Sequence, residues 1–90
     1  MESNHKKRHE QRLQVMGERK TAFLATFDGP MAERVLDFLS GFCREHESCY
    51  REDAREHALL EGRREVILTI RRYLELEPEK LVAYYHRKST

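Results

Sequence analysis

The stretch EGRREVILTIRRYLEL, residues 61–76, decides the fold because its apolar residues recur with a helical spacing. On a helical wheel centred on Val66, with about 100° per residue, Gly62, Ile70 and Tyr73 fall within about 40° of the centre. Further apolar residues lie outside this arc: Leu60, Ile67, Leu68 and Leu74. The apolar arc is wider than a surface helix needs, which predicts a central helix or one that contacts another subunit.

Signals for helix starts stand on both sides of this stretch. The sequence DGP at residues 28–30 offers Asp or Gly as a cap and Pro in the first turn. Asp53 followed by Glu56 resembles a capping box, and Pro78 opens a last short helix. Between these points the apolar residues step by threes and fours, and no stretch alternates with period two for long enough to form a strand.

The predicted fold is therefore all-α, a small bundle of three to four helices with an extended basic N-terminal helix or arm. Residues 1–20 are expected to form this arm or helix, and residues 21–90 a single helical domain. A chain of 90 residues buries a small share of its unfolded surface, so its stability margin should be thin.

Charge is divided along the chain. Residues 1–20 hold six Lys and Arg against three Glu, a local charge of +3. Residues 28–62 hold nine Asp and Glu against four Arg, a local charge of −5. Basic ends around an acidic middle favour head-to-tail contact between copies at least as much as contact with DNA, because a nucleic-acid module usually shows one dominant basic face.

The sequence carries no sign of a membrane segment or an export signal. No apolar run approaches the roughly 18 residues that span a bilayer, and the first twenty residues are too polar for a signal peptide. The protein is expected to be made and kept in the cytosol. Cys43 and Cys49 are then predicted to be free thiols, since disulfides are rare in that compartment.

The sequence contains candidate ligands for one kind of metal centre, a zinc site. Cys43, His46 and Cys49 follow one another at three-residue intervals, with His57 further on. Zinc sites usually pair their ligands at two separated places, and Phe42 beside Cys43 favours an ordinary buried thiol. We therefore expect no metal and no cofactor, with these three residues as weak candidates only.

Catalytic signals are also missing from the sequence. No Ser or Thr lies in a nucleophile-elbow context, no Gly-rich loop follows a strand, and no carboxylate pair lies in an apolar setting. The acidic residues have the positions of helix caps and charge partners. We expect that the protein is not an enzyme.

The helix over residues 61–76 supplies candidate contacts with another protein. Arg63 points about 60° from the centre of the apolar face, where it could reach a carboxylate on a neighbouring helix such as Asp37. The predicted interface residues are Leu60, Arg63, Ile67 and Leu68. Small residues at four-residue steps, Ala54, Ala58 and Gly62, would let another helix approach closely, and this packing role is favoured over the alternative that Gly62 marks a bend or an exposed weak point.

The remaining arginines of this stretch have two readings. Arg64 follows Glu61 by three residues, and Glu75 follows Arg71 by four, so these side chains can pair on the solvated edges of the helix. The alternative is that basic side chains bind phosphate, with a salt-sensitive arm at the amino terminus. The residues of this nucleic-acid hypothesis are Lys6, Lys7, Arg8, Arg12, Arg64, Arg71 and Arg72.

Two longer strings carry a resemblance. FLATFDGPMAERVLDFLSGFCREHES, residues 23–48, and EGRREVILTIRRYLEL resemble a small tailed-bacteriophage protein family named after a Bordetella phage gene product. The similar features are Phe27 before Gly29, Val35 with Leu36, Phe42 with Cys43, Ser48, and the EGRR string. The likeness covers roughly residues 23–76, and the family often has Pro where this chain has Ala54.

The resemblance implies a product of a head and packaging gene cluster, and no site residue can be carried over from it. It suggests a virion protein, made in the host cytoplasm, that contacts other phage structural proteins and itself as a homo-oligomer. The alternative is a nucleic-acid-binding accessory factor for genome packaging, with DNA contacted by the basic arm.

Overall fold

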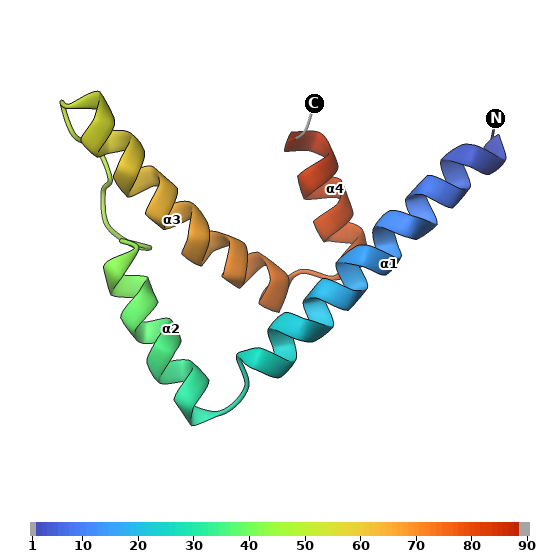
Figure 1. Cartoon of the computed structure of the whole chain (residues 1–90), viewed down its shortest axis with the longest axis horizontal. Coiled ribbons are helices and arrows are strands. Elements are labelled where there is room, and N and C mark those ends of the chain that lie inside the picture. The colour runs from blue at the N-terminus through green and yellow to red at the C-terminus, as the bar shows by residue number, and fades with distance from the viewer. Residues whose placement is uncertain (1, 89–90) are drawn as a thin grey trace. The chain divides into compact units, whose positions relative to one another are not determined.

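The computed structural model describes the backbone of residues 2–88 and the side chains of residues 4–86. This part of the chain contains four α-helices and no strand, which confirms the all-α prediction (Figure 1). The helices in chain order are α1 (Glu2–Thr26), α2 (Pro30–Phe42), α3 (Ala54–Glu75) and α4 (Pro78–Lys88). The basic amino-terminal stretch therefore belongs to a helix.

Three helices begin where local sequence signals predicted. Gly29 is the N-cap of α2, with φ 88° and ψ 179°. Residues with a Cβ rarely adopt this conformation. Pro30 follows in the first turn. The backbone N–H of Glu56 donates to the Asp53 carboxylate over 3.0 Å at the start of α3. Pro78 is the first residue of α4.

The carboxyl end of α2 is closed by a Schellman motif without glycine. Arg44 lies in the left-handed region with φ 55°. The N–H of Arg44 donates to the Gly41 carbonyl over 3.2 Å, and the N–H of Glu45 donates to the Ser40 carbonyl over 3.0 Å. The Arg44 guanidinium also donates to the Ser48 carbonyl over 2.9 Å. This turn fixes the direction in which Glu45 leaves the helix.

The described residues group into two compact units. One comprises the described residues of 1–25 and 72–90, and the other comprises residues 26–71. The division of the chain at residue 20 stays a prediction. Across residues 2–88, no helix has both the length and the apolar content needed to span a membrane.

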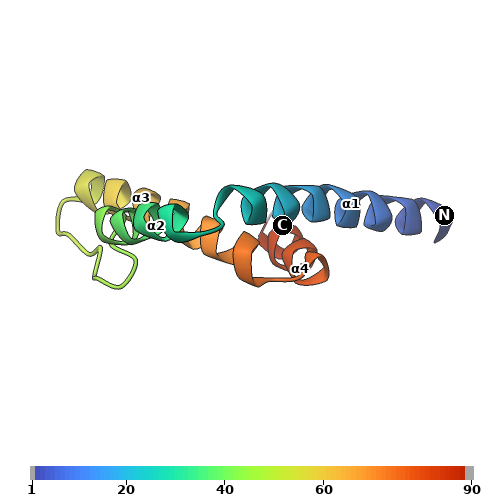
Figure 2. The same ribbon diagram turned by 90° about the horizontal axis from the view of Figure 1, so that it is seen from below.

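Residues 26–71 form the α2–α3 hairpin. The two helices lie side by side and run in opposite directions (Figures 1 and 2). Apolar residues on the facing sides of the two helices pack together, and Cys43 and Cys49 of the connecting loop are buried with them. The buried apolar residues of the hairpin are Ala32, Leu36, Cys43, Cys49, Leu60, Ile67 and Ile70.

The other unit joins α1, the last turn of α3, and α4 around Tyr73. Its ring stacks on Phe23 at 4.7 Å and on Tyr85 at 5.8 Å between centroids. The Lys20 ammonium donates to the carbonyls of Tyr73 and Leu74, over 3.2 and 3.3 Å, and so caps the negative end of α3. The ring stack and this cap hold α1 against the end of α3.

Candidate protein interface

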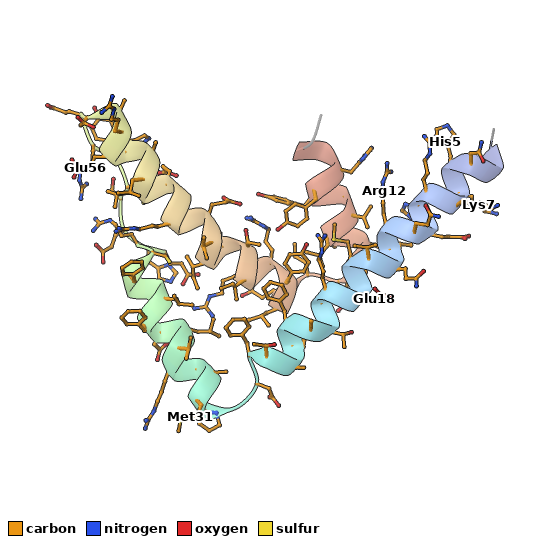
Figure 3. The ribbon with its side chains drawn as sticks, in the orientation of Figure 1. His5, Lys7, Arg12, Glu18, Met31 and Glu56 are labelled. Atoms are coloured by element: carbon orange, nitrogen blue, oxygen red, sulfur yellow. The ribbon has the colours of Figure 1, made fainter. Side chains whose placement is uncertain are left out.

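An exposed apolar stripe runs along α2, away from the hairpin core. Its four residues are spaced by four, three and four positions, and each leaves half or more of its surface exposed: Met31, Val35, Phe38 and Phe42. Met31 lies at the start of the helix (Figure 3), and Phe38 stacks on Phe42 with 5.9 Å between ring centroids. This spacing is that of a coiled-coil seam, which is normally covered by another helix.

The neighbouring edge of α3 continues this apolar surface. The Arg63 guanidinium lies over the Phe42 ring, 4.7 Å from its centroid. Leu59 is four residues before Arg63 and Val66 is three after it, so both lie beside Arg63 on α3. Both are more than half exposed. We call the following six residues the hairpin face: Met31, Val35, Phe38, Phe42, Leu59 and Val66.

Gly62 lies between the two α3 residues of the hairpin face. Apart from the adjoining residues and the backbone of its own helix, a Cβ added there would meet nothing within 4 Å. The packing of this chain therefore does not require glycine at this position, although glycine costs roughly 1 kcal/mol relative to alanine inside a helix. The space above Gly62 is open to a second protein.

The predicted interface residues lie partly inside the hairpin. Ile67 is fully buried and Leu60 nearly so, while Leu68 is half-buried. Arg63 lies against Phe42, and no ion pair with Asp37 accompanies this contact among the described side chains. That any of the four predicted residues contacts a second chain stays a prediction.

The exposed edge was missed because the apolar arc of α3 is so wide. A wheel shows how much of a helix is apolar, whereas the position of α2 decides which part is covered. The hairpin buries the flank around Ile67 and leaves Leu59 and Val66 exposed. On α2, the spacing of four, three and four residues was the signal in the sequence that could have located the stripe.

Glu45 binds two of the arginines, one through its buried carboxylate and one through its backbone carbonyl. Glu45 is 7% exposed, and its carboxylate accepts from Arg71 Nε over 3.0 Å and from Nη2 over 3.2 Å. Arg64 Nε donates to the Glu45 carbonyl over 3.2 Å. The bond from Arg71 lowers the pKa of Glu45 below its ordinary value of 4.5, against the opposing effect of burial. Arg71 therefore has a partner that helical spacing did not indicate.

Arg72 lies among tyrosines of α4. Its guanidinium lies 4.4 Å from the ring centroid of Tyr84, and its Nε donates to the Tyr85 hydroxyl over 3.3 Å. These contacts place the cation against aromatic faces, where it is stabilised by the ring quadrupole. Together with the bonds of Arg64 and Arg71, they give each α3 arginine of the nucleic-acid hypothesis a structural contact.

The basic side chains of α1 have a different environment. The exposed cations of its first half are Lys6, Lys7, Arg8 and Arg12. Figure 3 shows Lys7 and Arg12 pointing away from the helix. Arg8 and Arg12, together with Arg19, line a shallow hollow along α1. Of the residues in the nucleic-acid hypothesis, these four are the ones presented to solvent.

The cysteine and histidine side chains do not come together. Cys43 and Cys49 are buried free thiols, whereas His46 is largely exposed and lies 3.6 Å from the Glu45 carboxylate. The His57 Nδ1 lies 3.1 Å from the Cys49 carbonyl. Among the described residues, no group of three or more His, Cys, Asp or Glu side chains has a metal-binding arrangement.

Comparison with known proteins gives one result. The model of the Bbp19-like phage protein family matches residues 23–84, more than two thirds of the chain. This match includes the whole α2–α3 hairpin. No curated protein and no solved structure matches. The family match confirms the resemblance seen in the two quoted strings. This chain belongs to the family of Bbp19-like phage proteins.

Proposed function

We propose that this phage protein is a non-catalytic structural or assembly component of the virion, which acts in several copies through helix-mediated contacts with other proteins. The hairpin face carries this proposal. Monomeric soluble proteins rarely expose contiguous apolar patches larger than a few hundred Å², and larger ones commonly mark interaction sites.

The contacts beneath the face support this reading. The Glu45–Arg71 pair and the buried residues around Ile67 hold α2 against α3 from the opposite side. The exposed stripe is therefore not needed to close the hairpin. A surface of this kind on a firmly packed helix pair suits docking of another helix, since little conformational freedom is lost on binding.

Quantitative peptide mass spectrometry tests the proposal. We would count this chain against the portal and major capsid proteins, in purified particles and in precursor heads. A fixed, low copy number in either is expected for a structural or assembly component. Absence of the chain from both would contradict the proposal.

A phage variant links the count to the hairpin face. Phe38→Asp places a charge in the centre of the α2 stripe, whereas Tyr50→Asp changes an equally exposed aromatic residue in the loop after α2; both are 67% exposed. We expect particle yield to fall for the first variant and to stay near the original for the second. Equal particle yields from the two variant phages would argue against a role of the hairpin face in assembly.

A second candidate function rests on α1 alone. Lys6, Lys7, Arg8 and Arg12 are exposed on its first half, as a phosphate-binding helix would require. Four phosphate contacts predict that the logarithm of DNA affinity falls with the logarithm of salt concentration, with a slope of about −4. Replacing the four residues by Gln should remove the binding. Undetectable DNA binding at low salt would exclude this function.

A further inference from the structure

We propose that a second copy of this chain covers the α2 stripe, with the two α2 helices antiparallel about a twofold axis between Val35 and Phe38. This inference rests on the proposed function and deepens it, because it names the first partner of the hairpin face. A C2 pairing uses the same patch on both copies, so the patch must complement itself.

The spacing of the stripe meets this condition. Intervals of four, three and four residues read the same in both directions along the helix. In an antiparallel pair, Met31 faces the second copy's Phe42, and Val35 faces the second copy's Phe38. Each pair sets an aromatic ring against a smaller or more flexible apolar side chain, and such combinations of large and small residues interdigitate well.

The available area suits a small dimer. Each of the six residues of the hairpin face leaves half or more of its surface exposed. With aromatic side chains burying about 150–250 Å² when fully covered, the face offers roughly 600 Å² per copy. A standard interface buries about 800 Å² per partner, so the face and the aliphatic stems around it approach that size.

Charge does not oppose this pairing. The charged residues of α2 are Glu33, Arg34 and Asp37, and none of them belongs to the stripe. Antiparallel pairing therefore buries no charge of α2 in the seam, and the one cation beside it, Arg63, already lies against the Phe42 ring. The chain as a whole carries a formal charge of +1, so long-range repulsion between two copies is weak.

Gly62 on the neighbouring helix is compatible with this pairing. It lies between Leu59 and Val66, and a Cβ built there meets nothing within 4 Å apart from the adjoining residues and the backbone of its own helix. A second copy that covers the face would come near this open position, where the lack of a side chain permits close approach.

Light scattering of the purified full chain gives the first test. We expect a dimer mass at concentrations of tens of micromolar that persists at high salt, because apolar burial drives the association. Phe38→Asp should raise the dimer dissociation constant at least about 100-fold, as charge in a buried interface centre does. Tyr50→Asp is the matched control and should remain dimeric.

Circular dichroism keeps this comparison interpretable. Phe38 and Tyr50 are both exposed, so neither replacement creates a cavity in the hairpin core. Unchanged helical content in both variants would assign the loss of dimer to the stripe. A monomer mass for the original chain up to hundreds of micromolar would overturn the inference.

Photo-cross-linking tests the orientation. With p-benzoylphenylalanine in place of Phe42, antiparallel pairing predicts a covalent product at Met31, since benzophenones react well with methionine. Within one helix the two positions are eleven residues apart, about 16 Å, which excludes reaction inside a single chain. A product at position 42 or its neighbours on the second copy would show parallel pairing and would overturn the antiparallel model.

The two proposals fail separately. A monomeric chain that is nevertheless counted in particles or precursor heads would refute the self-pairing and leave the structural role intact. A dimer that is absent from both would refute the structural role and leave the self-pairing intact.

Discussion

Arg71→Met should destabilise the α2–α3 hairpin by about 3 kcal/mol, because it leaves the buried carboxylate of Glu45 without its cation. Breaking a buried ion pair from one side typically costs 3–5 kcal/mol. The lower end applies here, since the Arg71 side chain is 32% exposed while that of Glu45 is 7% exposed. For a domain of this size, that loss corresponds to a decrease of roughly 12–24 °C in Tm.

The reverse replacement should cost less. Glu45→Gln keeps the shape of the side chain, loses the charge, and leaves a guanidinium that water can reach, so we expect a loss of about 2 kcal/mol. The double variant should be less destabilised than the sum of the single variants by about 2 kcal/mol or more, because the stranded carboxylate is gone.

Denaturant unfolding followed by circular dichroism measures these free energies. Arg51→Met is the matched control, because its partner carboxylate, Glu56, is 56% exposed, against 7% for Glu45, so this pair should contribute no more than about 1 kcal/mol. Effects of Glu45→Gln and Arg71→Met that add to within about 0.5 kcal/mol would refute the reasoning, since independent sites behave in that way.

Acid gives a further check on the same pair. The pKa of Glu45 is lowered in the folded chain, so its contribution to stability is fully present above the ordinary value of 4.5. That contribution is lost as the pH falls through the folded-state pKa. The difference in unfolding free energy between the original chain and Glu45→Gln should therefore be full near neutral pH and shrink below 4.5. A difference that is constant from neutral pH to acid would contradict the assignment.

The other predictions concern local backbone and core, and all can be measured by the same denaturation experiment. Gly29→Ala should destabilise by about 1–3 kcal/mol, because a side chain is strained at φ 88° even where space is open. Gly62→Ala should instead stabilise the isolated chain by up to about 1 kcal/mol, and effects of the same sign at both glycines would contradict these two assignments. Asp53→Ala should cost about 1 kcal/mol through the lost N-cap of α3, whereas no loss would show that the 3.0 Å bond to Glu56 contributes little. Ile67→Ala should cost about 3–4 kcal/mol, since the side chain is fully buried, and a cost under 1 kcal/mol would place Ile67 outside the core.

Helix starts were predictable because their chemistry is local. The DGP sequence at residues 28–30, the Asp53–Glu56 spacing and Pro78 each act within one turn of the chain. The all-α class followed from apolar spacing in the same way. None of these conclusions requires knowledge of which helix lies beside which.

The ion pair of Glu45 with Arg71 could not be predicted, because it depends on a turn for which the sequence has no glycine signal. Glycine usually occupies the left-handed position after a helix, and here Arg44 occupies it. Without that turn, nothing places Glu45 beside Arg71, which is 26 residues away. Spacing along one helix pointed to Glu75 as the partner, since it sees only neighbours on the same element.

The hairpin face could be predicted only in part. Its α2 residues follow a seam spacing that is visible in the sequence, whereas Leu59 and Val66 belong to an arc on α3 that is apolar on most sides. The position of α2 selects the buried flank around Ile67. The flank with Leu59 and Val66 stays exposed, and this could not be predicted without knowing how the two helices of the hairpin pack.

Hydroxyl-radical footprinting of the chain, free at low concentration and within precursor heads or particles, tests the central claim most directly. The account predicts that labelling of Met31 and Phe38 falls strongly in the assembled state, while labelling of the equally exposed Tyr50 changes little. Equal labelling of the hairpin face in the free and assembled states would contradict the claim that this face is the working surface of the protein.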